Sequence, residues 1–550
     1  MPTFAAVDIG SNSCRLKIAK VVAHHLKTLH EDREVTRLGA SVFESGLVSP
    51  EAMAATLQAL KRFQRAVQLH GAEQIRVVAT SAMRDARNAA VFQARVKEET
   101  GWTMEIISGL EEGRLIHLGV LGLDGAVPVV EYKTAGRVLL VDLGGGSCEI
   151  TLSERKRILE TVSLPLGAVR LTQEFLTADP PPAEGLVRMR QFIARELRRA
   201  HRRIQPEKIS QVIATSGTAA ALSDAFAAMA KGGGGKAARN EGKSGKGSAN
   251  KTAGKAVHSL TVSRAGSGLQ AAGIVPAREV RKLANKLAQL PFAGRAAIEG
   301  IGPRRAEIIV PGALVFAELL ESFALAGFRY SPLGLRDGIL AQMLAVEDAR
   351  AAAHREFERE RWESVLATAR RYGVVLRQAE PVRVHALQLY RELQALHQLP
   401  PEYESWLAAA AVLRDTGKFI NHQGHHRHTQ YIVSSSEIYG CTQLQRTLIS
   451  AIARYLGKSR PQPGDRPLRN IPAGEHQYVQ RAVVLLRLAV ALNQDRASDV
   501  LRFAARVYPK RVHLEVQPGR TGAELELWSL RKEADYFREV FGRELFCTLA

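Results

Sequence analysis

The chain has 550 residues, enough for three or four domains of about 100–200 residues each, and its 46% apolar and 24% charged residues are typical of a globular protein. Lys and Arg number 76 against 55 Asp and Glu, a net charge of +21, which indicates a polyanionic partner: nucleic acid, an anionic membrane surface or a phosphorylated substrate. No apolar run approaches the ~20 residues that span a bilayer, and no secretory signal is visible. Four scattered cysteines without a CxxC pair argue against a disulfide scaffold or structural zinc, so we expect a cytoplasmic protein with no membrane partner.

Short apolar runs alternate with helical patterns in the first part of the chain, which predicts an α/β fold. We expect strands at residues 4–9, 75–79, 104–107 and 138–141, with helices at 51–70 and 88–99. A second set of strands is expected at 149–152, 158–163 and 211–214, with a basic helix at 182–203.

Residues 231–255 interrupt this pattern with a stretch rich in Gly, Lys, Ser and Ala. Such a segment buries too little apolar surface to offset its ordering entropy, so we predict a disordered insert. It carries six Lys and one Arg against one Glu, a net of +6, which leaves 21 − 6 = +15 for the rest of the chain.

The pattern is mostly helical from about residue 277, with strands near the end. Helices are expected at 307–325, 336–344, 350–372, 381–398, 403–413 and 443–456, and strands at 503–508, 511–516 and 523–528. We expect α/β domains at 1–126 and 127–345, a helical domain at 350–475 and an α+β lobe at 476–550. Both α/β portions open with a strand and an Asp-x-Gly turn, which indicates a duplicated domain.

Two matching turns are the strongest chemical motif. In FAAVDIGSNSCRL the strand ends at Asp8 and is followed by Gly10, Ser11, Asn12 and Ser13; in VLLVDLGGGSCEIT it ends at Asp142 and is followed by Gly144, Gly145, Gly146 and Ser147. Glycine lets successive backbone N–H groups face one anion. One such turn is usually a plain hairpin, but two facing each other would grip a phosphate chain. Asp8 is a candidate metal ligand, through water.

Three weaker signals accompany these turns. A third turn, Ser216-Gly217-Thr218, also follows an expected strand. In EIISGLEEGRL, Glu111 and Glu112 open a helix, where acidic residues often only complement the helix dipole; one of them is alternatively the base that orients a water. Arg84, after the strand at 75–79, is either a surface residue or a bidentate phosphate clamp.

Together these segments resemble the exopolyphosphatase / guanosine pentaphosphate phosphohydrolase family, in the superfamily of actin, sugar kinases and heat-shock ATPases. The matching segments, in family order between residues 4 and 344, are DIGSNS, TSAMRDA, IISGLEEGRLI, DLGGGSCEI, LPLGAVRLT, TSGT and VPGALVF, followed by AAAVLRDTGKFINHQGHHRHTQYIV at 409–433. The resemblance implies two actin-like, ribonuclease H-like domains around a phosphate cleft, an α-helical HD-like domain and a small α+β lobe.

The resemblance also implies an activity: release of orthophosphate from the end of inorganic polyphosphate, assisted by Mg²⁺, in a homodimer. It assigns Glu112 as the catalytic base, Asp142 to water activation and the metal, and Arg84 to phosphate. The metal ligands would be Asp8, Asp142 and Glu112. The phosphate-binding residues would be Ser11, Asn12, Ser13, Gly144, Gly145, Gly146, Ser147, Ser216, Gly217 and Thr218. Hydrolysis of guanosine pentaphosphate (pppGpp) is the close alternative, since the same cleft chemistry serves both.

The HD-like region departs from the metal-binding pattern of HD hydrolases. His385 fits the first histidine, but the His-Asp pair is replaced by Arg414-Asp415, and arginine cannot ligate a metal. We therefore expect a structural or polymer-binding domain. Its basic residues would help to hold the polymer, with His426, Arg427 and His428 as channel candidates, together with arginines at 198–203 and 355–371.

Two other classes share some of these features. An actin-like ATPase or sugar kinase would use the same two turns, but the segment SGLEEGRL resembles the hydrolytic element of the family. A nucleic-acid-binding protein would use the Lys-rich insert as an arm, but the insert has no interleaved aromatic residues to stack on bases, so no sequence-specific nucleic-acid binding is expected.

Overall fold

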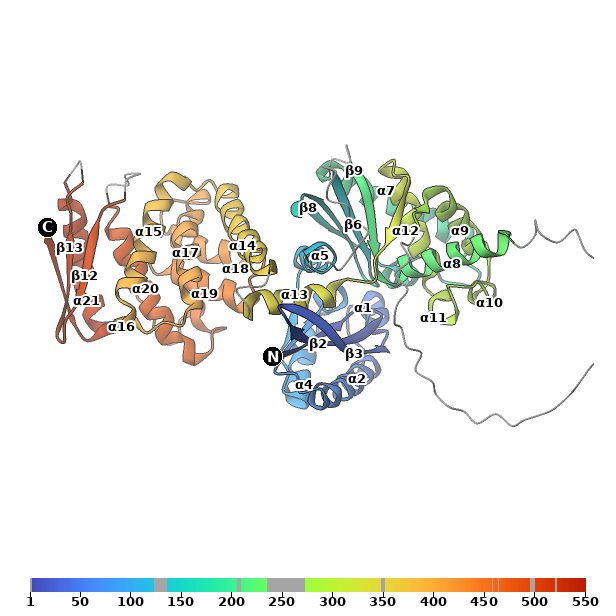
Figure 1. The fold of residues 1–550 in the computed structure, drawn as a ribbon, viewed down its shortest axis with the longest axis horizontal. Coiled ribbons are helices and arrows are strands. Elements are labelled where there is room, and N and C mark those ends of the chain that lie inside the picture. The colour runs from blue at the N-terminus through green and yellow to red at the C-terminus, as the bar shows by residue number, and fades with distance from the viewer. Residues whose placement is uncertain are drawn as a thin grey trace, which may run out of the picture. The chain divides into compact units, whose positions relative to one another are not determined.

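The computed structural model describes residues 2–122, 136–204, 209–234, 273–347, 352–457, 459–462, 464–494, 500–519 and 522–550. The chain forms two compact units, Met1–His354 and Arg355–Ala550 (Figure 1). No helix in the described part of the chain is both long and apolar enough to cross a membrane. In the predicted insert, residues 231–234 are the end of a helix, and the remainder lies outside the described residues.

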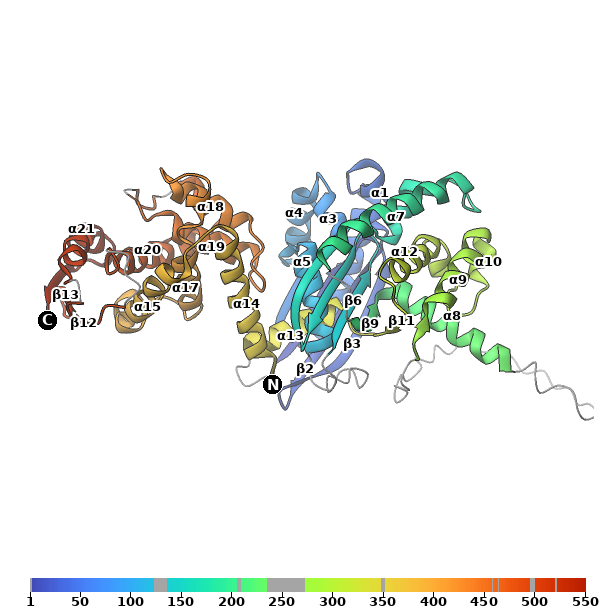
Figure 2. The same cartoon turned by 90° about the horizontal axis from the view of Figure 1, so that it is seen from above.

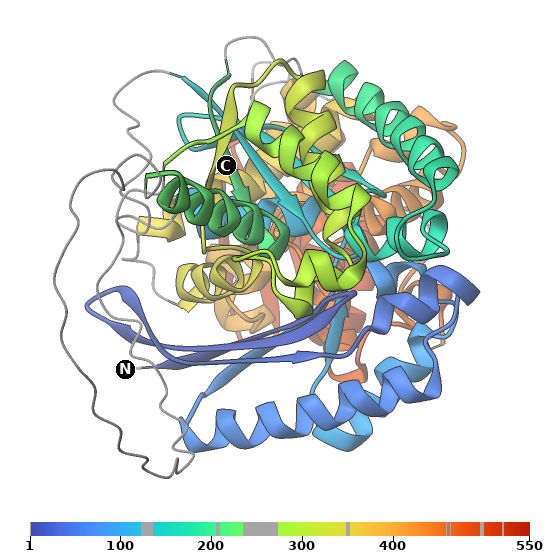
Figure 3. The same cartoon turned by 90° about the vertical axis from the view of Figure 1, so that its right-hand side faces the viewer.

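The first sheet of the first unit has five strands in the order β3-β2-β1-β4-β5. They are β1 (Thr3–Ile9), β2 (Ser13–Val22), β3 (His25–Val35), β4 (Gln74–Ala79) and β5 (Met104–Ile106). β1, β2 and β3 are antiparallel, whereas β4 and β5 run parallel to β1. One face packs on α1 (Leu38–Ser45), α2 (Pro50–Leu69), α3 (Ser81–Asp85) and α4 (Ala89–Thr100), and the other on α13 (Leu335–Glu347). Both faces are covered, so β1 is buried along its whole length; Figure 3 shows α2 lying along one of them.

The second sheet of this unit repeats the topology of the first. Its order is β10-β11-β9-β6-β7-β8. The strands are β6 (Arg137–Leu143), β7 (Cys148–Glu154), β8 (Arg157–Leu164), β9 (Ile209–Thr215), β10 (Val275–Pro276) and β11 (Gly327–Tyr330). β6, β7 and β8 are antiparallel, while β9 and β11 run parallel to β6, as β4 and β5 do to β1. The expected duplication is therefore confirmed.

Helices cover both faces of the second sheet (Figure 2). One face carries the larger apolar core. The helices on that side are α6 (Ala168–Phe175), α7 (Ala183–Arg203), α8 (Ser216–Gly234), α9 (Ala277–Gln289), α10 (Phe292–Ala296), α11 (Pro303–Ala306) and α12 (Ile309–Ser322). The opposite face packs on α5 (Gly109–His117) and its π-helical continuation Leu118–Gly122. The predicted α/β class is confirmed for the first unit.

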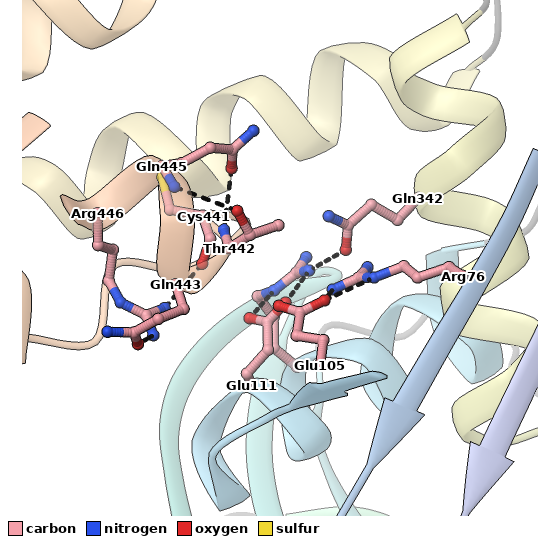
Figure 4. Close-up of polar contacts among 10 residues, drawn as sticks. Arg76, Glu105, Glu111, Gln342, Cys441, Thr442, Gln443, Gln445 and Arg446 are labelled. Atoms are coloured by element: carbon pink, nitrogen blue, oxygen red, sulfur yellow. Dashed lines mark hydrogen bonds and ion pairs between the residues drawn. The ribbon is translucent and has the colours of Figure 1, made fainter. Parts of the chain in front are cut away.

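The second unit is mostly helical and has one apolar core. Its helices are α14 (Ala352–Arg371), α15 (Leu376–Glu392), α16 (Gln394–His397), α17 (Glu402–Leu413), α18 (His425–Ser435), α19 (Gln443–Arg454), α20 (His476–Ala491) and α21 (Glu524–Phe541), with 3₁₀ turns Thr416–Phe419, Arg466–Leu468 and Ala473–Glu475. A capping box starts α19: Thr442 Oγ1 accepts from Gln445 N–H (3.2 Å) and Gln445 Oε1 accepts from Thr442 N–H (2.9 Å; Figure 4). The core spans both the expected helical domain and the expected C-terminal lobe, and the boundaries at 126, 345 and 475 stay predictions.

The C-terminal sheet confirms the expected β-containing end but corrects one strand. Its order is β12 (Phe503–Val507), β13 (Arg511–Val516) and β14 (Glu544–Leu549). The strand predicted at 523–528 is wrong, since these residues enter α21. Leu525 and Leu527 alternate as in a strand, but the buried positions continue at helical spacing through Leu530 and Phe537 while Leu525 is exposed. Another boundary also differs: α15 begins at Leu376, so Pro381 lies within the helix predicted to start there.

Candidate active site

A cleft of about 430 Å³ in the first unit brings the three predicted turns together. It lies at the ends of β1 and β6, where the strands of both sheets turn back. The predicted residues that line it are Asp8, Ser11, Asn12, Ser13, Glu112, Asp142, Gly144, Gly145, Gly146, Ser147, Ser216, Gly217 and Thr218. Segments more than 200 residues apart in the sequence thus meet at one site.

The two Gly-rich turns are hairpins of the same construction. Gly10 N–H donates to the Ser13 carbonyl (3.1 Å), and Gly144 N–H donates to the Ser147 carbonyl (3.0 Å). Across each hairpin the strand-end aspartate pairs with the residue that follows the cysteine: Asp8 with Arg15, and Asp142 with Glu149.

Glycine is required at the second turn because the two hairpins approach each other closely. A Cβ at Gly145 would lie 3.1 Å from the Ser11 Cβ, and one at Gly146 would lie 2.6 Å from both the Ser11 and the Ser81 hydroxyl oxygens. The Ser11 Oγ is buried and has no hydrogen-bond partner among the described residues. The two backbones can therefore converge on one anion only without side chains at these positions.

The third turn joins the end of β9 to α8. Ser216 adopts a left-handed conformation (φ +78°), and its hydroxyl donates to the Leu143 carbonyl (2.7 Å), which ties this turn to the end of β6. Gly217 leaves room for the Arg305 guanidinium: a Cβ there would overlap it. The N-terminus of a 19-residue helix and an arginine side chain thus face the same part of the cleft.

Glu112 lies in the first turn of α5, which Ser108 caps by accepting from Glu111 N–H (3.1 Å). Arg84 of α3 donates to Glu112 Oε2 (2.9 Å), to the Ile107 carbonyl (2.9 Å) and to the Ser147 hydroxyl (3.2 Å). Arg84 is therefore no solvated surface residue: it joins the expected base to the second Gly-rich turn.

Behind Glu112, α5 is fixed to α13 by a buried polar contact. Arg114 donates two hydrogen bonds to Glu111 (2.8 Å each) and one to Gln342 of α13 (2.5 Å). Figure 4 shows Glu111 and Gln342 at this contact, beside the ion pair of Arg76 and Glu105 (3.0 Å). Of the two glutamates, Glu111 thus has a structural role, and only Glu112 lines the cleft.

Three carboxylates gather at the floor of the cleft: Glu112 and Asp142 line it, and Glu149 is buried behind them. Glu112, Asp142 and Glu149 offer oxygen atoms that all lie within 4.8 Å of one another, the only such set of potential metal ligands in the described ranges. The Thr215 hydroxyl donates to Asp142, and the Ser163 hydroxyl donates to Glu149 Oε1 (2.8 Å), whereas the buried Glu149 Oε2 has no hydrogen-bond partner among the described residues. Hard oxygen ligands of this kind suit Mg²⁺.

Burial and mutual repulsion hold protons on this cluster. Burial raises the pKa of Glu112 to about 7, and the nearby Asp142 and Asp8 add to the shift, although Arg84 opposes it. Burial, then the charge of Glu112, raises the pKa of Glu149 well above its usual range. The pKa of Asp142 is also raised, mainly by burial. A cation would relieve this repulsion.

Arginines from distant segments line the cleft beside the carboxylates. They are Arg15, Arg33, Arg305 and Arg336. Arg15 and Arg33 are directly opposed across β2 and β3, an arrangement in which like charges repel. Burial and the neighbouring arginines lower the pKa of Arg33 and of Arg305 to about 10. Such a concentration of positive charge favours an anionic ligand.

The family model described as the Ppx/GppA phosphatase family matches residues 17–347, more than half of the chain. The chain belongs to this family. A second model, described as Ppx/GppA phosphatase, domain III, matches residues 360–536. The second unit of this phosphatase therefore also corresponds to a domain of the family.

Several known proteins are similar to this family member. Exopolyphosphatase 2 of Mycobacterium tuberculosis is 32% identical over 57% of this chain and 89% of its own. A guanosine-5'-triphosphate,3'-diphosphate pyrophosphatase of Pseudoalteromonas atlantica is 26% identical over 90% of this chain and 88% of its own. The crystal structure of an exopolyphosphatase from Cytophaga hutchinsonii shares the fold, with a TM-score of 0.51 at 24% identity over 62% of this chain and 97% of its own.

Some residues singled out from the sequence of this phosphatase lie elsewhere. Asp8 lines the cleft but is not in the three-carboxylate set. In the second unit, His385 is buried in the core beside Phe503, and Asp415 pairs with Lys418 (2.8 Å) and Arg414 (3.5 Å). His426, Arg427 and His428 line a separate groove with Arg454.

The arginines at 198–203 lie away from the cleft of the phosphatase. They occupy the C-terminal end of α7, which leads to the start of β9, whereas the cleft lies at the end of β9. Two of them are paired, Arg199 with Glu196 and Arg203 with Glu160.

Sequence reasoning missed Glu149 and the four cleft arginines of this phosphatase. Glu149 and Arg15 both belong to the two hairpin motifs named above. Each follows a hairpin serine by two residues, and side chains two residues apart point to the same side of a strand, so the sequence offered a signal for both. Arg33, Arg305 and Arg336 had no local signal, because only the fold brings their segments to the cleft.

Proposed function

We propose that the chain is an exopolyphosphatase, which hydrolyses the terminal phosphoanhydride bond of inorganic polyphosphate and releases orthophosphate. The observation that carries the proposal is one cleft in which two Gly-rich hairpins face a buried set of three carboxylates, with arginines along the wall. The similarity to an exopolyphosphatase, 32% identical, supports the same substrate.

The residues of the cleft suit phosphoryl transfer to water, which depends on positioning and charge stabilisation more than on covalent catalysis. In the proposal, backbone N–H groups of the two hairpins and the hydroxyls of Ser11 and Ser147 hold the terminal phosphate. Glu112, which lines the cleft, accepts a proton from the attacking water. Arg84, already bonded to Glu112 and Ser147, offsets negative charge on the phosphate.

Glu112, Asp142 and Glu149 are the proposed ligands of Mg²⁺, with Asp8 reaching it through water. Their clustered oxygens and the unpartnered Glu149 Oε2 fit such an ion. When bound, Mg²⁺ would neutralise charge that develops on the transferred phosphoryl group.

A polymer rather than a small phosphate is proposed because arginines line the cleft beyond the three-carboxylate set, although Glu31, Asp32 and Asp337 lie among them. Arg15, Arg33 and Arg336 would bind phosphates behind the terminal one. In the second unit, the groove of His426, Arg427, His428 and Arg454 is proposed as a further contact for long chains. The homodimer, the HD-like character of the second unit and the cytoplasmic location also remain proposals, supported by the family resemblance.

Hydrolysis of pppGpp is the second candidate. The relative named as a guanosine-5'-triphosphate,3'-diphosphate pyrophosphatase aligns with 90% of the chain, including the second unit. The same hairpins and carboxylates would serve its terminal phosphate.

The test is phosphate release from long-chain polyphosphate and from pppGpp side by side, each with Mg²⁺ and with a chelator. We expect Mg²⁺-dependent release with a higher kcat/KM for polyphosphate. A clear preference for pppGpp would replace the first proposal by the second. ATP-dependent phosphorylation of a small acceptor, without hydrolysis of either compound, would instead indicate a kinase.

A further inference from the structure

The boundary between the two sheets of the first unit is crossed by a side chain that the proposed chemistry does not use. Arg170 lies on α6, next to the second sheet. Its Nε donates to the Gly146 carbonyl (2.8 Å), in the second Gly-rich hairpin. Its Nη2 reaches α3 of the first sheet, where it donates to the Ser81 hydroxyl (3.1 Å) and pairs with Asp85.

The same arginine also stacks on the half of the unit that contains the first sheet; we call this half the first lobe and the half with the second sheet the second lobe. Its guanidinium carbon lies 4.1 Å from the centroid of the Phe43 ring, on α1. One planar cation thus contacts the hairpin of one lobe and two helices of the other. The Arg170 side chain is only about one quarter exposed, which fixes its orientation better than that of a surface arginine.

Arg84 makes the reciprocal connection. It starts on the same short helix, α3, and reaches in the opposite direction to Ser147, the neighbour of Gly146. Two arginines therefore link α3 to the second hairpin, Arg84 through a side-chain hydroxyl and Arg170 through a backbone carbonyl. Only Arg84 also contacts a carboxylate of the cleft floor.

We propose that Arg170 and Asp85 form an interlobe clamp that sets the distance between the two Gly-rich hairpins, and that Arg170 is a positioning residue for hydrolysis. The clamp fixes the Gly146 carbonyl, so the N–H groups of this hairpin stay aimed at the phosphate that the Ser11 hairpin also holds. A displacement of about 1 Å at a reacting group costs up to about 100-fold in rate. The Asp85 side chain is 45% exposed, and an ion pair with such a partner contributes little to stability, so the clamp acts on geometry more than on folding.

The experiment compares Arg170→Met, Asp85→Asn and the conservative Arg170→Lys with the wild-type chain. The matched control is Arg188→Met, which removes an arginine of the same lobe whose exposed partner, Glu184, lies on its own helix. In the activity measurement, which rests on the proposed function, we expect kcat for long-chain polyphosphate to fall roughly 10–100-fold in Arg170→Met and Asp85→Asn. KM should change less than about threefold, Arg170→Lys should keep most of the turnover, and Arg188→Met should match the wild type.

A second measurement is independent of the substrate. Spin labels at Leu69→Cys on α2 and Val187→Cys on α7, both exposed positions, report the distance between the lobes, and the native cysteines are buried. We expect Arg170→Met to broaden or lengthen this distance distribution while the thermal midpoint stays near that of the control. An unchanged distribution, or an unchanged kcat, overturns the clamp. A wild-type chain that hydrolyses neither polyphosphate nor pppGpp rejects the proposed function, but the distance measurement still tests the clamp.

Discussion

At the scale of single residues, the floor of the cleft brings three carboxyl groups together. Glu112, Asp142 and Glu149 all have raised pKa values, and burial is the largest cause for each. Arg84 lies 2.9 Å from Glu112 Oε2 but 4.0 Å from Glu149 Oε1, so its charge acts most directly on Glu112. That contact keeps its pKa near neutrality rather than far above it, the range in which a carboxylate can both accept and release a proton at working pH.

Replacement of this base tests its role most directly. We expect Glu112→Gln to lower kcat for polyphosphate by roughly 10²–10⁴, since Gln keeps the shape and a hydrogen-bond acceptor for Arg84 but cannot accept the proton. The measurement is steady-state phosphate release, with Glu98→Gln, on the exposed side of α4, as the control. Near wild-type turnover would remove Glu112 from the mechanism.

The same substitution has a predictable effect on stability. Because the pKa of Glu112 is raised to about 7, the folded state binds more protons than the unfolded state between about pH 4.5 and 7, and stability falls as pH rises through that window. Gln carries no such charge. We expect Glu112→Gln to have a higher thermal midpoint than the wild type at pH 8 in chelator, and a smaller difference at pH 4.5. Equal differences at both pH values would contradict the raised pKa.

At the scale of elements, most helices and strands could be predicted from apolar patterns, because β1 and β6 are short continuous runs of buried residues and the buried residues of α2 recur at helical spacing. The error at 523–528 shows the limit. Two alternating leucines fit a strand and the first turn of a helix equally well, and only the later contacts of α21 with α20 and β14 decide between them.

The hairpin glycines should tolerate alanine in a graded way. A Cβ at Gly144 would meet only the Ser147 carbonyl at 3.5 Å, an ordinary contact; at Gly145 the nearest atom is 3.1 Å away, and at Gly146 it is 2.6 Å away. We expect kcat to fall least in Gly144→Ala, more in Gly145→Ala and most in Gly146→Ala, where the hairpins are pushed apart. Thermal midpoints measured for the same three variants distinguish a loss of kcat from a loss of folding. If kcat fell most in Gly144→Ala and least in Gly146→Ala, close approach of the hairpins would not be the cause.

At the scale of the whole molecule, the sequence located the cleft but not its full chemistry. Motifs predicted the hairpins, because their glycines and serines are contiguous in the chain. The arginine wall could not be predicted, since Arg33, Arg305 and Arg336 stand on segments that meet only after both sheets have formed. The local density of charge did not indicate the place of the cleft either, since the arginine-rich end of α7 lies away from it.

Salt and chain length together test the use of both units. Each bound phosphate releases counterions, so KM for long polyphosphate should rise with KCl more steeply than KM for a short chain. We expect Arg427→Ala, in the second groove, to raise KM for long chains several-fold and to flatten this salt dependence, with little effect on pppGpp. Equal effects on long and short substrates would show that the groove does not bind the polymer.

The two Gly-rich hairpins differ in the charge of one side chain at matching positions, and this makes the two sides of the cleft unlike. In both hairpins the strand-end aspartate pairs with the residue after a buried cysteine. In the first hairpin that residue is the cation Arg15, and in the second it is the carboxylic acid Glu149. Two copies of one topology thus carry different side chains at matching positions. An anion between the hairpins is attracted towards the copy that carries Arg15, so the free length of a phosphate chain is favoured on that side of the cleft before any contact specific to its end is made.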